Sequence, residues 1–224
     1  MPKLKDNALE NSLSTLFSII VFTLLGFGSG AASEIANAKS SNVNAGTLLS
    51  KARSQITANP SFVITLLSKE IATTNKSPEL LFLLGRAHQE IKQDVSALIY
   101  FTVAITKDPN YTKALVSRGL ARGALRDLDG AKKDFDQAIL QDPRNTAALL
   151  NRGVTLGALN RADDAIKDFS ECIRLEPTKS EAYRNRGISN FLLGRSKEAC
   201  IDWENAEGLG DTEMKSWRSA YCNK

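Results

Sequence analysis

Histidine and cysteine, which often act in catalysis and metal binding, are scarce in this 224-residue sequence, and they form no familiar reactive set with other residues. The one histidine, His88, lies in a stretch with helical spacing, at a position that suits a half-buried core side chain. The acid pairs Asp163-Asp164 and Asp127/Asp129 lie at expected turns, where carboxylates cap helix N-termini. No phosphate-binding loop, Gly-x-Ser-x-Gly, His-Glu-x-x-His or Cys-x-x-Cys pattern is present. We therefore expect no enzymatic activity, no metal site and no cofactor.

The chain repeats itself with a period of 34 residues. Such a fixed period indicates one supersecondary unit stacked on copies of itself. The residues that recur at this interval are Pro109, Pro143 and Pro177; Gly85, Gly119, Gly153 and Gly187; Ala97, Ala131, Ala165 and Ala199; Phe101, Phe135, Phe169 and Trp203; and Ala104, Ala138, Cys172 and Ala206.

Each unit reads as a pair of helices joined by a tight turn. Residues 114–125 and 131–140 both have apolar residues at helical spacing, and the break between them is short. The dipeptide Asp142-Pro143 ends the second helix, because proline lacks an amide donor and disfavours helix at the preceding residue. Small residues let the two helices cross closely. We predict an all-α protein, an α-solenoid of antiparallel helical hairpins.

These repeated residues resemble the tetratricopeptide repeat family. The resemblance covers about residues 78–211 and is closest to a bacterial-type subclass with an Asn-Arg-Gly core, seen at 151–153 and 185–187. It implies four units, at 77–109, 110–143, 144–177 and 178–211. Residues 47–76 read as a degenerate hairpin that caps the N-terminal end, and residues 212–224 read as a C-terminal capping helix.

The N-terminal segment has the layout of an export signal. Residues 11–33 carry no charge, Lys3 and Lys5 precede them, and small residues follow. Residues 1–38 are thus expected to be a cleaved signal peptide or an uncleaved membrane anchor, with 39–46 as a linker. If the basic end stays inside, either outcome places the repeats outside the cytoplasm, in a periplasm, in a lumen or in the medium. The net charge of +4 is small and the basic residues are interspersed with acidic ones, so no nucleic-acid partner is expected.

The three cysteines fall into two groups. Cys172 occupies a small-residue position and is expected to be buried and inert. Cys200 lies early in the last repeated helix and Cys222 ends the terminal helix. If these helices run antiparallel around the turn at 208–210, a Cys200–Cys222 disulfide is geometrically plausible, and similar endings occur in the subclass that the chain resembles. The alternative is two free thiols.

An arginine and an aspartate keep a separation of 16 residues in three units. In the first unit both positions change together to apolar or aromatic residues, Leu84 and Tyr100, which suggests contact. We expect partly buried ion pairs that stabilise the fold, and an arginine row for anionic ligands is the alternative. The pairs are Arg118/Asp134, Arg152/Asp168 and Arg186/Asp202.

The resemblance also implies where a partner binds, because the first helices of this family line a concave face. Here that face is apolar with arginines at both ends, which departs from the Lys and Asn pattern that clamps peptide carboxylates. We expect a protein or peptide with an apolar or amphipathic segment. The alternatives are packing between hairpins, or cover by the N-terminal segment or a second copy. The predicted contacts are Phe82, Arg86, Gln89, Val116, Leu120, Leu150, Val154, Arg184, Ile188 and Phe191.

The expected function is a non-catalytic scaffold that holds partner proteins, exported or membrane-tethered, and aids assembly or maintenance of a membrane or envelope complex. The alternative is a structural protein whose apolar groove is used in a homodimer. Contact with a membrane is expected only through the N-terminal segment, if that segment is uncleaved.

Overall fold

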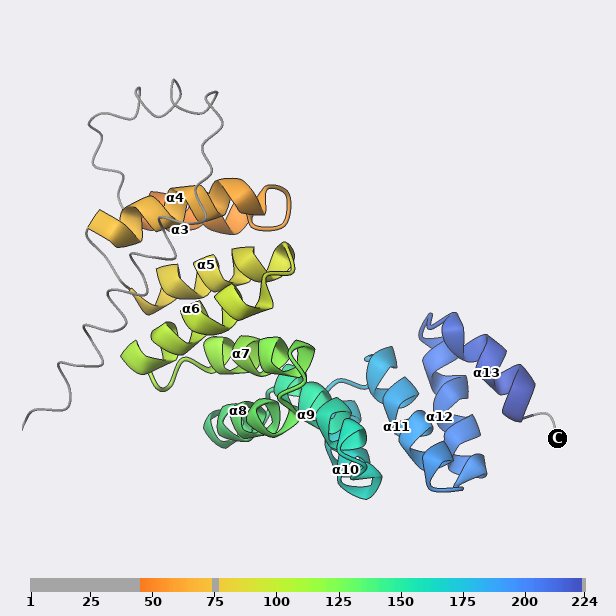
Figure 1. Cartoon of the computed structure of the whole chain (residues 1–224). Coiled ribbons are helices and arrows are strands. Elements are labelled where there is room, and N and C mark those ends of the chain that lie inside the picture. Colours follow the sequence, from red (N-terminus) through yellow and green to blue (C-terminus); the bar gives the residue numbers. More distant parts are fainter. Residues whose placement is uncertain (1–44, 74–76, 223–224) are drawn as a thin grey trace, which may run out of the picture. The chain divides into compact units, whose positions relative to one another are not determined.

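The structure, a computed structural model, describes residues 45–73 and 77–222, all within one compact unit of the chain. The expected signal or anchor at 1–38 lies outside the described residues. Over the described residues the protein is all-α, as predicted, and consists of helical hairpins in sequence (Figure 1). The helices are α3 (Ala45–Gln55), α4 (Pro60–Thr73), α5 (Pro78–Glu90), α6 (Asp94–Lys107), α7 (Thr112–Ala124), α8 (Leu128–Gln141), α9 (Thr146–Ala158), α10 (Ala162–Leu175), α11 (Ser180–Leu192), α12 (Ser196–Gly208) and α13 (Glu213–Tyr221).

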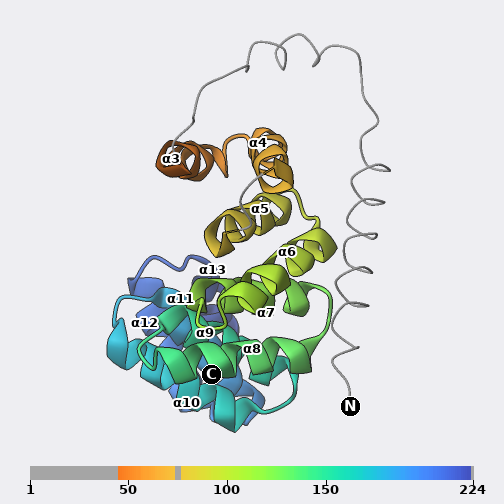
Figure 2. The same cartoon turned by 90° about the vertical axis from the view of Figure 1, so that its left-hand side faces the viewer.

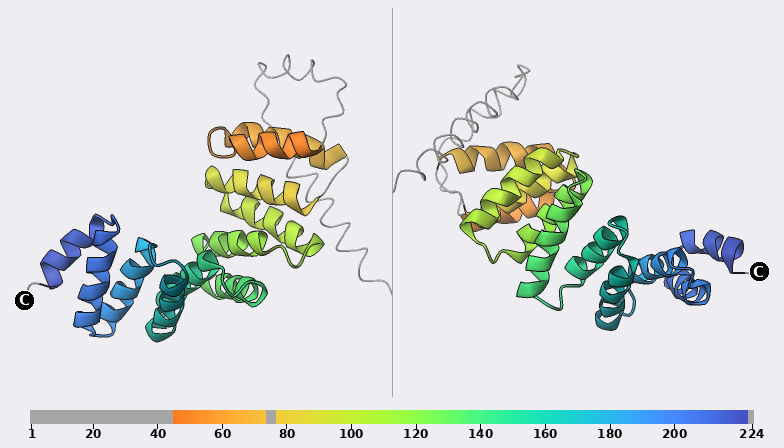
Figure 3. Two further views of the ribbon diagram at one scale, coloured as in Figure 1. Left: turned by 180° about the vertical axis from the view of Figure 1, so that it is seen from behind. Right: turned by 60° about the horizontal axis from the view of Figure 1, so that its bottom comes forward.

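Each helix packs against the helices before and after it in the chain, which gives a solenoid. Figures 2 and 3 show from other sides how each hairpin lies beside the next, with α13 beside α12 at the C-terminal end. Helix α4 packs on α5, so the N-terminal hairpin α3–α4 joins the stack.

The repeated glycine and aromatic positions meet inside each hairpin. A Cβ atom placed on Gly119 would lie 2.6 Å from the Phe135 ring, and one on Gly153 would lie 2.6 Å from the Phe169 ring. Both rings are buried. Glycine therefore lets the first helix rest directly on the aromatic ring of the second, which explains why these two positions repeat together.

The turns inside the hairpins also share one geometry. In the four hairpins from α5 to α12, one residue at the turn has a left-handed backbone conformation, with φ of 60° at Lys92, 66° at Arg126, 59° at Asn160 and 76° at Gly194. These residues are 34 apart, so the conformation belongs to the repeat and not to the local residue type. Asp127 next to such a turn caps α8 by accepting a hydrogen bond from the Gly130 amide (2.9 Å).

The other acidic turn residues do not act as the helix caps that the sequence suggested. Asp163 and Asp164 lie in the first turn of α10, whose N-cap position is Arg161. Asp163 pairs with Arg195 of the next hairpin (2.7 Å), and Asp164 pairs with Arg161 (2.6 Å). Acidic side chains in a first turn still interact favourably with the helix dipole.

Candidate partner-binding surface

The first helices of successive hairpins form one continuous face. Helix α5 contacts α7, α7 contacts α9, and α9 contacts α11. Residues one period apart therefore lie in line across these helices. We call the side of these four helices that bears Arg86, Leu120, Val154 and Ile188 the inner face.

The centre of the inner face is apolar. Leu120 of α7 and Val154 of α9 have 40% and 47% of their surface exposed. Val116 and Leu150, one turn earlier, are half-buried and pack against the cores of the adjoining hairpins. The structure thus brings four of the predicted contacts together as an apolar floor across α7 and α9.

Two glycines widen this floor. A Cβ atom placed on Gly123 or Gly157 would have no atom of the described residues within 4 Å. Both residues are in the last turn of their helix and lie one turn beyond Leu120 and Val154. Glycine costs up to about 1 kcal/mol relative to alanine in a helix, and here no packing within residues 45–73 and 77–222 requires it. The result is open space over the backbone beside two exposed aliphatic side chains.

The N-terminal end of the predicted contact row differs from the expectation. Phe82 is buried, with its ring centroid 5.9 Å from that of Phe101 and 5.2 Å from that of Tyr111. Tyr111 comes from the turn before α7 and covers the position, so Phe82 is a core residue and not an exposed ligand contact. Arg86 pairs with Glu90 of its own helix (3.3 Å), and Gln89 is half-buried.

The C-terminal end is covered by the chain itself. The Phe191 ring lies 4.8 Å from that of Tyr221 and 6.5 Å from that of Trp217, both on α13. Ile188 is half-buried in the same cluster. Arg184 donates to Asp211 at 2.9 Å, just before α13. These three predicted contacts are therefore engaged by the C-terminal segment in the described structure.

The arginines of α7, α9 and α11 are paired within the chain. Arg152 contacts both oxygens of Asp168 (2.8 and 2.6 Å) and reaches Asp136 of the preceding hairpin (2.8 Å). The other two pairs have the same two-point geometry: Arg118 with Asp134 at 3.0 and 2.6 Å, and Arg186 with Asp202 at 3.0 and 2.6 Å.

The contacts of Arg152 shift the pKa of the arginine and of Asp136. Hydrogen bonding to Asp168, opposed by burial and aided by Asp136, raises the pKa of Arg152. Burial by itself would raise the pKa of Asp136, but hydrogen bonds from Lys132 and Arg152 outweigh it, so the pKa of Asp136 falls. Since the guanidinium groups are neutralised inside the fold, they offer little charge to an anionic ligand.

Comparison with known proteins agrees with this architecture. The family model described as tetratricopeptide repeat matches residues 116–171 and 154–211. A crystal structure of MamA aligns with a TM-score of 0.67 at 19% identity, over 75% of this chain and 96% of MamA. The thermophilic TPR protein TTC0263 of Thermus thermophilus aligns with a TM-score of 0.62 at 20% identity, over 78% of this chain and 97% of that one.

Residues 116–211 of this chain match the tetratricopeptide repeat family, and the chain shares the fold of MamA and TTC0263. The solved structures are similar to it in fold, and the fold supports a role in protein–protein interaction. No curated protein matches the sequence.

The one histidine, His88, is packed within its hairpin. His88 stacks on Tyr100 (5.2 Å between ring centroids), and its Nδ1 lies 2.6 Å from the Gln93 amide oxygen, so Nδ1 carries the proton that it donates. Burial lowers the pKa of His88, and the hydrogen bond with Gln93 opposes this shift.

Within residues 45–73 and 77–222, no group of His, Cys, Asp or Glu side chains could hold a metal ion. None of the helices described is long and apolar enough to cross a membrane.

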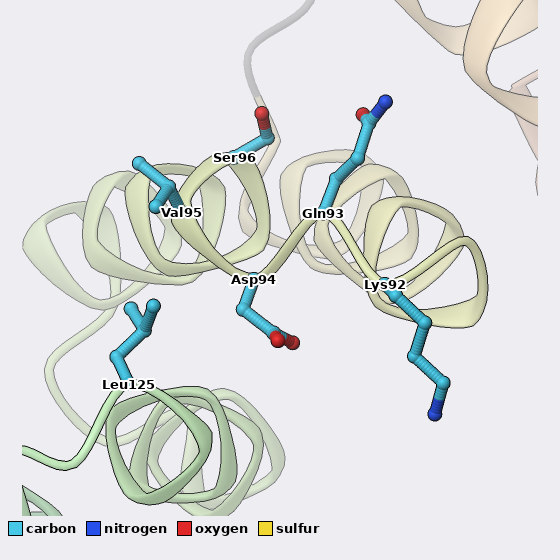
Figure 4. A pocket seen from close by; sticks show the side chains of 6 residues that line it. All are labelled: Lys92, Gln93, Asp94, Val95, Ser96 and Leu125. Carbon is cyan, nitrogen blue, oxygen red and sulfur yellow. The ribbon is translucent and has the colours of Figure 1, made fainter.

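One surface feature has no counterpart among the predicted contacts. Val95 of α6 and Leu125, which follows α7, point toward a common gap (Figure 4). Both are well exposed, and Lys92, Gln93, Asp94 and Ser96 complete the lining of this shallow depression.

The last two helices are joined covalently. The structure bonds Cys200 of α12 to Cys222, the residue that follows α13, with sulfur atoms 2.03 Å apart. Cys172 is buried and unbridged. Its thiol lies 3.7 Å from the carbonyl oxygen of Thr146, and burial raises its pKa to about 11, so it stays protonated near neutral pH.

Proposed function

We propose that this protein is a non-catalytic scaffold that binds a partner protein through the centre of its inner face. The observation that supports this most is the exposure of Leu120 and Val154 beside the open space over Gly123 and Gly157. Covering apolar surface contributes about 25 cal/mol per Å². The favoured occupant is an amphipathic helix or an extended apolar segment, which would bring apolar side chains to this floor.

The glycines add a geometric reason. Without side chains at positions 123 and 157, the backbone or large side chains of a partner can approach the helices closely, as at other glycine-lined contacts. The corresponding positions in the outer hairpins hold Gln89 and Phe191, so the open space is confined to α7 and α9.

The test is affinity capture with crosslinking from the native host. The wild type is compared with a Leu120→Glu, Val154→Glu variant whose helical content is checked by circular dichroism. A matched control is Leu140→Glu, because Leu140 is 75% exposed but lies on α8, a second helix. Loss of a partner by the double variant alone supports the proposal. Equal capture by all three proteins contradicts it.

The second candidate is self-association, with the inner face of one copy covered by another copy. The same exposed pair, Leu120 and Val154, supports it. Sedimentation velocity over a hundredfold range of concentration separates the two candidates. A monomer at every concentration disfavours the homodimer, whereas a dimer that Leu120→Glu dissociates favours it.

We further propose that the repeats act outside the cytoplasm, where they help assemble or maintain a membrane or envelope complex. The support is the uncharged segment 11–33 with basic residues before it and small residues after it. N-terminal sequencing of the protein isolated from fractionated host cells is the test. A mature N-terminus near residue 38 supports export with cleavage, while an intact protein in the cytoplasmic fraction contradicts export.

A further inference from the structure

The C-terminal helix covers the aromatic end of the inner face. Trp217 and Tyr221 of α13 contact the Phe191 ring, and Trp217 also lies 5.3 Å from Trp203 of α12. Phe191 occupies the same repeat position as Gly123 and Gly157. Moving α13 away would therefore expose an apolar ring in line with the open floor of α7 and α9.

Helix α13 packs through few side chains, Met214 and the rings of Trp217 and Tyr221. The helix has nine residues, and Met214 is its one side chain that is buried among those described. Tyr221 is 49% exposed. A helix this short is not stable by itself in water, so its position depends on what fastens it to α12.

The ion pairs of α13 contribute little to that fastening. Arg218 contacts Glu204 (3.0 Å), whose side chain is 67% exposed, and such exposed pairs are screened by water and salt. Its contact with Glu207 (2.5 Å) is partly buried, with about a third of each side chain exposed, so water and salt still weaken it. The better buried contact, Arg184 with Asp211, lies before the start of the helix. The far end of α13 is therefore held by the ring contacts of Trp217 and Tyr221 together with the Cys200–Cys222 bond, which is its one covalent link to α12 among the described residues.

We propose that the Cys200–Cys222 disulfide is a redox latch that keeps α13 closed over Phe191 and Trp203. A dithiol reductant would attack the half-buried disulfide, transfer two electrons and two protons to give two thiols, and itself become a disulfide. Helix α13 would then detach at its C-terminal end, and the inner face would gain the Phe191 ring. The regulated surface is the inner face of the proposed function, on which this latch therefore rests.

Hydrogen–deuterium exchange of the full chain, with and without dithiothreitol and without any partner, tests the latch. The loop closed by the bond spans 22 residues. We expect amides of α13 to exchange about 100-fold faster after reduction, because the local opening equilibrium loses the loop constraint, while α5–α10 keep their protection. Unchanged exchange in α13, with both thiols shown to be reduced by mass, would overturn the proposal. Equal acceleration across all helices would also overturn it.

Variants separate the latch from other thiol effects. Cys200→Ser should show the fast exchange of α13 without reductant, and Cys172→Ser should remain closed until it is reduced. Because exchange is measured without a partner, α13 opening remains observable even if Leu120 and Val154 bind nothing. If partner binding depends on Leu120 but amide exchange in α13 is the same with and without reductant, the proposed function is supported and the latch is rejected.

Discussion

At the residue scale, the contacts between the paired arginines and aspartates could be predicted from their spacing in the repeat. Their separation of 16, and the joint change to Leu84 and Tyr100 in the first unit, indicated a contact that the structure contains. The second partner of Arg152, Asp136, was not foreseen because it comes from the preceding hairpin. Its spacing of 16 in the opposite direction was a signal available in the sequence.

Removing one member of such a pair should destabilise the fold. Asp168 is buried, so Asp168→Ala would leave Arg152 with Asp136 alone, and we expect a loss of about 2 kcal/mol, below the 3–5 kcal/mol of a fully buried pair because the arginine is partly solvated. Urea denaturation followed by circular dichroism measures the change. Asp164→Ala, which removes two solvent-exposed pairs, with Arg161 and Lys167, is the control and should change the midpoint much less. An unaltered midpoint for Asp168→Ala would show that the pair is not stabilising.

A second residue-scale prediction concerns acid. The pKa of His88 in the folded protein is below its ordinary value of 6.5, so the folded state binds a proton there less readily than the unfolded state does. The stability that this histidine contributes is present above pH 6.5 and is lost as the pH falls through the folded pKa. We expect the urea midpoint to fall between pH 7 and pH 5 in the wild type and to fall less in His88→Gln. Parallel curves for the two proteins would argue against this origin.

At the element scale, the turn geometry is set by the repeat and is accommodated differently by each residue. The left-handed residue at these turns is Gly194 in one hairpin and Asn160 in another, both suited to that conformation. Lys92 and Arg126 are not. No residue type marks the four positions in common, so the conformation was not predictable from composition, although the spacing of 34 links them.

Replacing a residue that disfavours the left-handed conformation at these turns should therefore stabilise the fold. Arg126→Gly is expected to raise stability by about 0.5 kcal/mol, because relief of left-handed strain exceeds the added entropy of the unfolded chain. Gly194→Ala is expected to lower it by about 1 kcal/mol for the opposite reason. Thermal denaturation of both variants measures the signs. A stability decrease in Arg126→Gly would mean that other contacts of the arginine dominate.

The helix glycines divide into two classes with opposite predictions. Gly157→Ala should stabilise the fold by about 0.5 kcal/mol, since its Cβ meets no atom, and should weaken partner binding on the inner face. Gly153→Ala, in the same helix, should destabilise it by about 1–3 kcal/mol because its Cβ would overlap the Phe169 ring. Denaturation and the capture assay measure the two effects. A Gly157→Ala protein that is more stable and captures as well as the wild type would remove the glycine from the binding surface.

At the scale of the whole molecule, the sequence predicted the solenoid far better than its surface. The helices and their order follow from a period that every unit repeats. The exposure of side chains at the two ends of the inner face does not follow from the period, because Tyr111 packs on Phe82 and Trp217 packs on Phe191. Both covering residues come from the segment that follows the hairpin they contact, so no analysis within one unit reveals them. Leu120 and Val154 lie at the centre, with similar units on both sides, and their exposure could therefore be predicted from the repeat.

Such a stack should also open from its ends. Stability in a solenoid is approximately a sum over neighbouring units, so a hairpin with one neighbour is held less firmly than one with two. Helix α3 contacts chiefly α4, with a smaller contact to α5, whereas α8 and α9 are packed on both sides. Native-state hydrogen exchange should therefore show the least protection in α3 and the greatest in α7–α10. A change at the centre such as Phe135→Leu should speed exchange across several hairpins, while Leu67→Ala in α4 should act near the N-terminal end. Equal protection in all helices, lost together at one denaturant concentration, would show instead that the molecule unfolds as a single cooperative unit.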